Sequence, residues 1–324
     1  MRAVICPSLG DEMGLRTEEV APPAMIAGGV RIAIAAAGVN FADGLVIAGR
    51  YQERLEPPFI PGFEVAGTVI ETAPDVTGFT AGDRVMAVVD SGGFAEQVVA
   101  RATDTHRLPD RMDWATAAGF PIVYGTSHHS LAARAALKAG ETLLVLGAAG
   151  GVGLTAVEIG RALGATVIAS AGGPAKTEVA RAHGAHAVID YREEPLRDRV
   201  KALTGGKGAD VVYDPVGGDL FDQALRSLAP TGRLLAIGFA SGAIPQIPAN
   251  ILLVKNLSVI GYHWGAYRRL DPAGLADSFR QLLGWFDQGL LSPIVSQTLP
   301  LERAAEAIGL LKSRQATGKL VLTV

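Results

Sequence analysis

Cysteine is nearly absent from this 324-residue sequence, which contains only Cys6. One thiol can form neither an intrachain disulfide nor a multi-thiolate metal site, so we expect a reducing, cytoplasmic setting. A charge excess is missing too, because 29 Lys and Arg face 32 Asp and Glu and leave a formal net charge of −3. Without surplus basic residues to neutralise phosphates, nucleic acid is not expected as a main partner. The composition favours a small-molecule ligand.

Targeting and membrane signals are also lacking. Asp11 and Glu12 interrupt the N-terminal region before any apolar run, which is unlike a signal peptide. Two uncharged stretches, 114–133 and 234–254, are long enough to cross a bilayer, but each contains proline and polar side chains. We therefore expect interior segments there and no membrane partner.

The sequence does contain enough apolar residues, 49%, to fill the cores of about two domains. The first part, residues 1–110, is divided by glycine and proline into short β segments, which is typical of a barrel-like, β-rich module. The expected strands are 2–5, 30–39, 65–73, 84–89 and 95–100.

From about residue 140, apolar strands alternate with helical patterns. The strands are continuously rather than alternately apolar, which indicates a parallel sheet buried on both faces and hence a doubly wound, Rossmann-type α/β domain. The expected strands are 142–147, 165–171, 187–190, 210–214 and 232–238. The tail, with expected strands near 294–298 and 319–324, is predicted to rejoin the first module. The predicted domains are therefore 1–118 with 266–324, and 119–265.

A glycine-rich loop follows the first strand of the parallel sheet. The segment GAAGGVG spans residues 147–153 and includes Gly150, Gly151, Val152 and Gly153. Glycines at this place let the backbone approach a pyrophosphate at the N-terminus of the next helix. Ala148 departs from the common G-x-G-x-x-G pattern, and we expect a somewhat wider turn. The alternative is a purely structural tight turn.

The choice between the two nicotinamide cofactors is made at the end of the second strand, where NAD enzymes place an acid. Here Ser170 and Gly172 stand in a segment without a carboxylate, and Lys176 follows. A cation there can pair with the 2′-phosphate of NADPH, although Lys176 could also be an ordinary exposed lysine. Tyr191 and Arg192, after the third strand, are expected to flank the adenosine.

Seven segments together resemble one known family. They are GVNFADGLVIAGRY (38–51), PGFEVAGTV (61–69), GDRVMAV (82–88), GAAGGVG (147–153), DYREE (190–194), DVVYDPVGG (210–218) and ATGKLVLTV (316–324). The chain looks like the medium-chain dehydrogenase/reductase superfamily, in its zinc-free, zeta-crystallin-like quinone oxidoreductase branch. The resemblance implies a GroES-like catalytic domain, a Rossmann domain, NADPH as cofactor and a homodimer.

The residues at the zinc-ligand positions of the family indicate whether this chain could bind zinc. Zinc-dependent relatives have a ligating cysteine and a Gly-His-Glu. By the resemblance, this chain has Asn40 at the cysteine position and Gly62, Phe63 and Glu64 in place of the Gly-His-Glu. With one thiol and a phenylalanine at the histidine position, we expect no metal. Glu64 is then expected to accept hydrogen bonds in the domain core, and Asp43 to be a helix-start or loop carboxylate.

The resemblance also implies site residues. Asn40 would donate its amide to a carbonyl, Tyr51 would polarise the substrate oxygen or deliver a proton, and Thr126 would contact the nicotinamide. Asn40 could instead cap a loop, and Tyr51 could merely pack its ring. Further cofactor contacts are expected at Val216, Phe239, Ala240, Ser241 and Lys319.

Three functions remain open at this point. The leading expectation is hydride transfer from NADPH to a quinone without zinc. The first alternative is reduction of α,β-unsaturated carbonyls, either enones or enoyl thioesters, because the same polarised carbonyl serves both. The second is a catalytically weak NADPH-binding protein with a structural or regulatory role.

Overall fold

The computed structural model describes residues 1–10, 12–313 and 316–324, and it forms two compact units. The first unit comprises Met1–Ile122 and Pro293–Val324, and the second comprises Val123–Ser292. The first unit is discontinuous in sequence. Its return segment begins at Pro293 rather than at residue 266, because the helices between them pack within the second unit, where His128 contacts Ser278.

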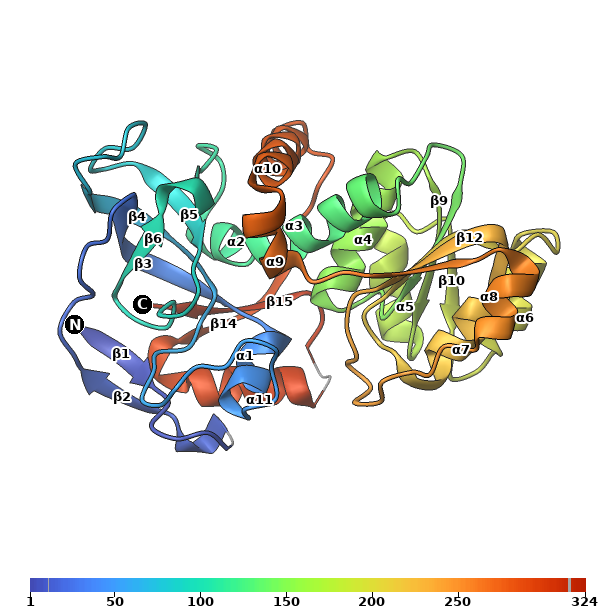
Figure 1. Ribbon diagram of the computed structural model, residues 1–324, viewed down its shortest axis with the longest axis horizontal. Helices are drawn as coiled ribbons and strands as arrows, with labels where there is room; N and C mark the ends of the chain where they lie inside the picture. Colours follow the sequence, from blue (N-terminus) through green and yellow to red (C-terminus); the bar gives the residue numbers. More distant parts are fainter. Residues whose placement is uncertain (11, 314–315) are drawn as a thin grey trace. The chain divides into compact units, whose positions relative to one another are not determined.

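Antiparallel strands dominate the first unit (Figure 1). Its main sheet has seven strands in the order β14-β15-β3-β4-β5-β7, with β6 also paired to β3, and β1 pairs separately with β2. The strands are β1 Arg2–Ile5, β2 Arg16–Glu19, β3 Gly29–Val39, β4 Glu64–Thr72, β5 Arg84–Val88, β6 Gln97–Arg101, β7 Thr105–Arg107, β14 Val295–Pro300 and β15 Lys319–Thr323. The helices are α1 Phe41–Ile47, α2 Trp114–Ala118 and α11 Ala304–Lys312.

The return of the C-terminus to the first unit is built into its core. β15 lies between β14 and β3, and Leu320 pairs with Val39 in the antiparallel register. Both side chains are buried in one apolar cluster with residues of β4 and α11. The last strand therefore brings Lys319 next to the residue that precedes Asn40.

The second unit is a six-stranded parallel sheet in the order β10-β9-β8-β11-β12-β13. Numbered from β8, this is the 3-2-1-4-5-6 order of dinucleotide-binding domains. The strands are β8 Thr142–Leu146, β9 Thr166–Ala171, β10 Ala187–Asp190, β11 Ala209–Asp214, β12 Leu228–Ala236 and β13 Ser258–Gly261. The helices are α3 Pro121–His129, which starts at the unit boundary, α4 Gly151–Ala162, α5 Pro174–Ala182, α6 Leu196–Leu203, α7 Gly218–Ser227, α8 Ala249–Lys255, α9 Trp264–Leu270 and α10 Pro272–Asp287.

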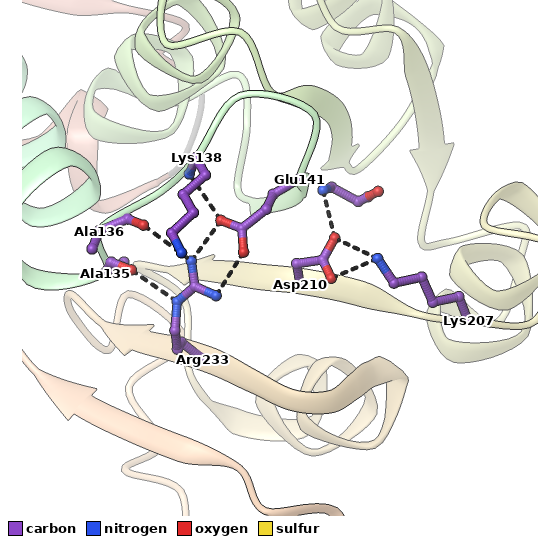
Figure 2. Close-up of polar contacts among 8 residues, drawn as sticks. Ala135, Ala136, Lys138, Glu141, Lys207, Asp210 and Arg233 are labelled. Carbon is purple, nitrogen blue, oxygen red and sulfur yellow. Dashed lines mark hydrogen bonds and ion pairs between the residues drawn. The ribbon is translucent and has the colours of Figure 1, made fainter.

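Ion pairs and hydrogen bonds connect the strands of this sheet near their amino-terminal ends (Figure 2). Arg233 of β12 donates to both carboxylate oxygens of Glu141, at 2.9 and 2.7 Å, and to the carbonyl of Ala135 at 2.8 Å. Asp210 of β11 accepts the backbone N–H of Thr142 at 2.8 Å. These contacts tie β8, β11 and β12 together at the end of the sheet opposite the glycine-rich loop.

Candidate functional site

The carboxyl ends of β8 and β11 meet where the strand order reverses, which is the place where open α/β sheets bind ligands. The chain leaves β8 for β9 on one side, and β11 pairs with β8 on the other. The two loops that follow these strands touch, because a Cβ on Gly147 would lie 3.0 Å from Cγ2 of Val216. The predicted glycine-rich loop and the predicted Val216 contact therefore share one end of the sheet.

The glycines of the loop have distinct roles. Gly147 has a positive φ of 59° and accepts the backbone N–H of Gly150 at 3.0 Å, which closes a tight turn. A Cβ on Gly153 would lie 2.2 Å from the carbonyl oxygen of Gly147, so only glycine permits α4 to start here. Gly150 is the N-cap of α4, so the first backbone N–H groups of the helix, beginning at Gly151 and Val152, have no acceptor within the helix.

The loop after β10 packs against the residues that follow β9. A Cβ on Gly172 would lie 2.6 Å from the hydroxyl oxygen of Tyr191, so the two predicted adenosine-side residues are in contact. Asp190 accepts the backbone N–H of Gly173 at 3.0 Å and that of Arg192 at 3.1 Å. The hydrogen bond from the Gly173 N–H and, to a smaller extent, that from the Arg192 N–H hold the pKa of Asp190 below its usual range.

No carboxylate occupies the end of β9 itself. Ser170 is fully buried there, and its hydroxyl oxygen has no hydrogen-bond partner among the described residues. Lys176 lies half-buried in the first turn of α5. Arg192 Nε would lie 2.9 Å from a Cβ on Gly172, Lys176 follows on α5, and Asp190 accepts backbone N–H groups.

The loops after β11 and β12 are joined to each other. Ser241 donates its N–H to the carbonyl of Val216 at 2.9 Å, and Ala240 donates to the carbonyl of Pro215 at 3.1 Å. Asp214, at the end of β11, accepts the N–H groups of Val216 at 2.7 Å and Gly217 at 2.9 Å. Phe239 is exposed at the tip of the second loop. The structure thus brings Val216, Phe239, Ala240 and Ser241 together.

A buried polar cluster occupies the first unit. Lys319 donates to Asn40 Oδ1 at 2.6 Å and to the carbonyl of Val39 at 2.9 Å, and it forms an ion pair with Glu64 Oε1 at 2.6 Å. Asn40 Nδ2 donates to the same Glu64 oxygen at 2.9 Å, and the N–H of Ile122 reaches Glu64 Oε2 at 2.8 Å. The expectation that Glu64 accepts hydrogen bonds in the core is confirmed.

The sequence analysis predicts Lys319 as a cofactor contact. An ammonium group has three protons, and here all three are directed to acceptors of the protein. The Lys319 side chain therefore holds the amide of Asn40. Sequence reasoning could not find this pairing, because 255 residues separate Lys319 from Glu64.

Asp43 is a helix-start carboxylate, as expected. Its Oδ2 accepts the backbone N–H of Asn40, the N-cap of α1, at 2.7 Å. Burial raises the pKa of Asp43 to about 7. The segment NFAD, residues 40–43, carries the signal for this contact, because an acid three residues after an N-cap asparagine is a capping pattern.

Tyr51 and Thr126 lie in different units. Tyr51 is partly buried with its ring 6.2 Å from that of Phe63, and burial raises the pKa of its phenol to about 12. Thr126 is buried on α3, next to Gly125, where a Cβ would lie 2.9 Å from the Trp264 ring. The Tyr51 phenol is therefore protonated at neutral pH, and Thr126 lies on a helix that packs against the indole of Trp264.

Other groups of titratable side chains in the second unit make internal contacts. His128 bonds to Ser278 and Gln281, and His129 Nδ1 lies 2.9 Å from the Tyr262 hydroxyl.

Among the described residues, no group of three or more His, Cys, Asp or Glu side chains could hold a metal ion. Within the same ranges, none of the helices has the length and apolar character needed to span a membrane.

Comparison with known proteins places this arrangement in a class. The alcohol dehydrogenase GroES-like domain family matches residues 27–110, and the zinc-binding dehydrogenase family matches residues 151–287. A GroES-like unit and a Rossmann-type parallel sheet in one chain define an oxidoreductase of the alcohol dehydrogenase type.

The individual similarities extend over the whole chain. It is 40% identical to the quinone oxidoreductase-like protein 2 homolog of Nematostella vectensis, over 99% of this chain and 88% of that protein. It resembles the structure of Escherichia coli quinone oxidoreductase complexed with NADPH, with a TM-score of 0.93, 30% identity and 100% of both chains covered. A mycobacterial protein complexed with NADPH has a TM-score of 0.94 and 32% identity, also over 100% of both chains. The chain belongs to the medium-chain dehydrogenase/reductase superfamily.

Proposed function

We propose that this protein is an NADPH-dependent, zinc-independent reductase of quinones. The observation that carries the proposal is the buried cluster in which Lys319 and Glu64 hold the side-chain amide of Asn40. An oriented neutral donor of this kind can polarise a carbonyl oxygen without a metal ion. The similarity to proteins named quinone oxidoreductase supports the choice of acceptor.

The residues at the sheet end fit a dinucleotide. Gly153 permits the close approach of loop and helix that a pyrophosphate site needs, and the N-terminus of α4 supplies N–H donors. In the proposal, Gly150, Gly151, Val152 and Gly153 hold the pyrophosphate. Ser170, Gly172, Lys176 and Tyr191 hold the adenosine half, and Val216, Phe239, Ala240 and Ser241 hold the nicotinamide half.

The preference for NADPH follows from charge at the end of β9. A carboxylate would repel a 2′-phosphate, whereas Lys176 and Arg192 attract it. Asp190 also lies after β10, where its Oδ1 accepts the backbone N–H groups of Gly173 and Arg192. Two structural relatives complexed with NADPH are consistent with this preference.

Zinc independence is proposed from the residues that stand at the cluster. Phe63 supplies no ligand atom, and the first carboxylate oxygen of Glu64 is already paired with an ammonium group. An ammonium beside Glu64 and a divalent cation at the same oxygen would repel each other. We therefore assign the electrostatic role to Lys319 and the polarising role to Asn40.

Quinone reduction adds one hydride and one proton to the substrate. Bound NADPH supplies the hydride. Asn40 has two N–H bonds; one is committed to Glu64, and the other is assigned to the substrate oxygen. Tyr51, whose pKa is raised to about 12, is assigned as a hydrogen-bond donor to that oxygen, with the proton drawn finally from solvent. Thr126 is assigned to orient the nicotinamide.

The proposal also includes assembly and location. β13 is an edge strand with β12 on one side, and the neighbouring α8 exposes Leu253 and Val254 almost fully. An exposed apolar edge of this kind is an association surface, and we propose a homodimer formed through it. The single, buried Cys6 is consistent with a cytoplasmic protein.

The test is NADPH consumption in one plate, with quinones, enones and enoyl thioesters as acceptors, with and without a metal chelator, and with NADH in parallel wells. Turnover of quinones that survives the chelator and prefers NADPH supports the proposal. Turnover of enones or thioesters alone would move the function to alkene reduction. Tight NADPH binding with no turnover of any acceptor would indicate a non-catalytic binder.

A further inference from the structure

Asp43 is a fully buried carboxyl to which the proposed hydride transfer gives no role. Its Oδ2 accepts the N–H of Asn40 at 2.7 Å, and the N–H of Gly62 also donates to this carboxyl. Its Oδ1 has no hydrogen-bond partner among the described residues. An ionised carboxylate with one unsatisfied oxygen in a dry interior is costly, whereas the neutral acid is much less so.

The charged groups around Asp43 come from each element packed against it. Lys319 of β15 favours its ionisation and Glu64 of β4 opposes it. Tyr51 and Glu53 follow α1, and α11 brings Lys312, whose ammonium is paired with Glu12 at 2.6 Å. Lys319 and Glu64 neutralise each other as an ion pair, so the proton on Asp43 decides whether the cluster is neutral or carries one negative charge.

We propose that Asp43 is a positioning residue that acts through Asn40: its proton keeps the buried cluster neutral, and loss of that proton adds a negative charge beside Asn40 that opposes reduction of the substrate. The effect on turnover rests on the proposed function. The effect on Asn40 itself does not, because the Asn40 N–H is bonded directly to Asp43 in the structure.

The physical reason is electrostatic. Hydride transfer to a carbonyl places negative charge on the oxygen that Asn40 is assigned to hold, and a second negative charge nearby raises the energy of that state. Burial brings the pKa of Asp43 to about 7, so the switch falls in the neutral range. Asp43→Asn keeps an oxygen acceptor of the same shape and cannot ionise.

Two readouts test the proposal on the full-length protein. The first is the backbone amide of Asn40, followed by NMR with selectively ¹⁵N-labelled asparagine; the chain has three asparagines, so Asn250 and Asn256 serve as internal controls. The Asn40→Ser variant assigns the signal. The second is the pH profile of kcat/KM for quinone at saturating NADPH, in wild type and in Asp43→Asn.

Asp113→Asn is the matched control. Asp113 is also a helix-start carboxylate, the N-cap of α2, and its side chain accepts the N–H of Thr116. Burial alone would raise its pKa, but the hydrogen bonds from Thr116 hold the pKa of Asp113 below its usual range. The same substitution at this position should leave both readouts near neutral pH unchanged.

The expected result is an Asn40 signal that shifts with a midpoint near pH 7 in wild type and not in Asp43→Asn. Wild-type kcat/KM should fall above neutrality by a factor on the order of tenfold, the scale of one added charge in a protein interior, and the variant should lose this decline. An Asn40 signal that does not titrate overturns the proposal, even if Asp43→Asn fails to fold. A titrating signal with identical pH profiles overturns the link to turnover. If no acceptor is reduced, the proposed function fails, and the NMR titration still decides whether Asp43 acts on Asn40.

Discussion

Asn40 makes two contacts through its buried side-chain amide and one through its backbone N–H. Its oxygen accepts from Lys319, its nitrogen donates to Glu64, and its backbone N–H donates to Asp43. The two side-chain contacts fix the orientation of the amide, and the backbone contact fixes the residue at the start of α1, so a substrate oxygen would meet a donor that is already oriented. Orientation before binding is what makes a neutral donor effective in catalysis.

Replacing Asn40 tests this role. We expect Asn40→Ala to lower kcat/KM for quinone by about 10²- to 10³-fold, the usual cost of one oriented donor to a developing oxyanion. NADPH affinity, measured by quenching of protein fluorescence, should change little. Gln297→Ala, which removes an exposed amide from β14, is the control. An equal loss of activity in both variants would contradict the assignment.

The proposed preference for NADPH depends on Lys176. Lys176→Ala should weaken kcat/KM with NADPH by about tenfold and leave the value with NADH unchanged, because only NADPH carries the 2′-phosphate. Lys138→Ala, which changes an exposed lysine beside Glu141 just before β8, is the control (Figure 2). The same loss with both cofactors would show that Lys176 does not select the phosphate.

At the scale of elements, the start of α4 depends on a glycine. Gly153→Ala would place a Cβ 2.2 Å from the Gly147 carbonyl oxygen. We expect it to lower the free energy of unfolding by about 1–3 kcal/mol, as overpacking does, and to abolish NADPH binding. Gly284→Ala, in α10 with nothing within 4 Å of the new Cβ, should instead stabilise by about 0.5–1 kcal/mol. Urea unfolding measures both, and a tolerated Gly153→Ala would contradict the packing argument.

The network at the amino edge of the sheet should give an acid-dependent stability. The hydrogen bond from Arg233 holds the pKa of Glu141 below its usual range. A lowered folded-state pKa adds stability above the usual glutamate range, which is lost as the pH falls through the folded value.

Glu141→Gln should therefore cost about 1–2 kcal/mol of unfolding free energy at pH 7 and less at low pH. Urea unfolding at several pH values checks this expectation. A cost that does not depend on pH would indicate that packing, and not the Glu141 charge, supplies the stability.

The parallel sheet and the glycine-rich loop were predictable because their signals are local. Continuous apolar runs located β8 to β12, and the fold class predicted from them is confirmed. The grouping of α9 and α10 with the second unit has a non-local cause, since contacts to α3 that no periodicity reveals hold them there. The same holds for the Asn40 cluster, whose members are predicted singly but meet only when β15 pairs with β3.

At the scale of the whole molecule, the proposed dimer predicts a response to charge on α8. Introducing Leu253→Asp together with Val254→Asp should convert a dimer into a monomer, because burying two carboxylates in an apolar contact is unfavourable. Light scattering coupled to size exclusion measures the mass. Leu270→Asp, which alters another highly exposed apolar residue, on α9, should leave the dimer intact. A wild type that is monomeric at micromolar concentration would contradict the proposal.

The most direct test of the central claim is the initial rate of NADPH oxidation by a quinone in chelator-treated buffer, with wild type and Asn40→Ala side by side. We expect turnover by the wild type that the chelator does not reduce, and a loss of about 10²-fold or more in the variant. A rate that disappears with the chelator and returns with zinc, or a variant as active as the wild type, would contradict metal-free polarisation by Asn40.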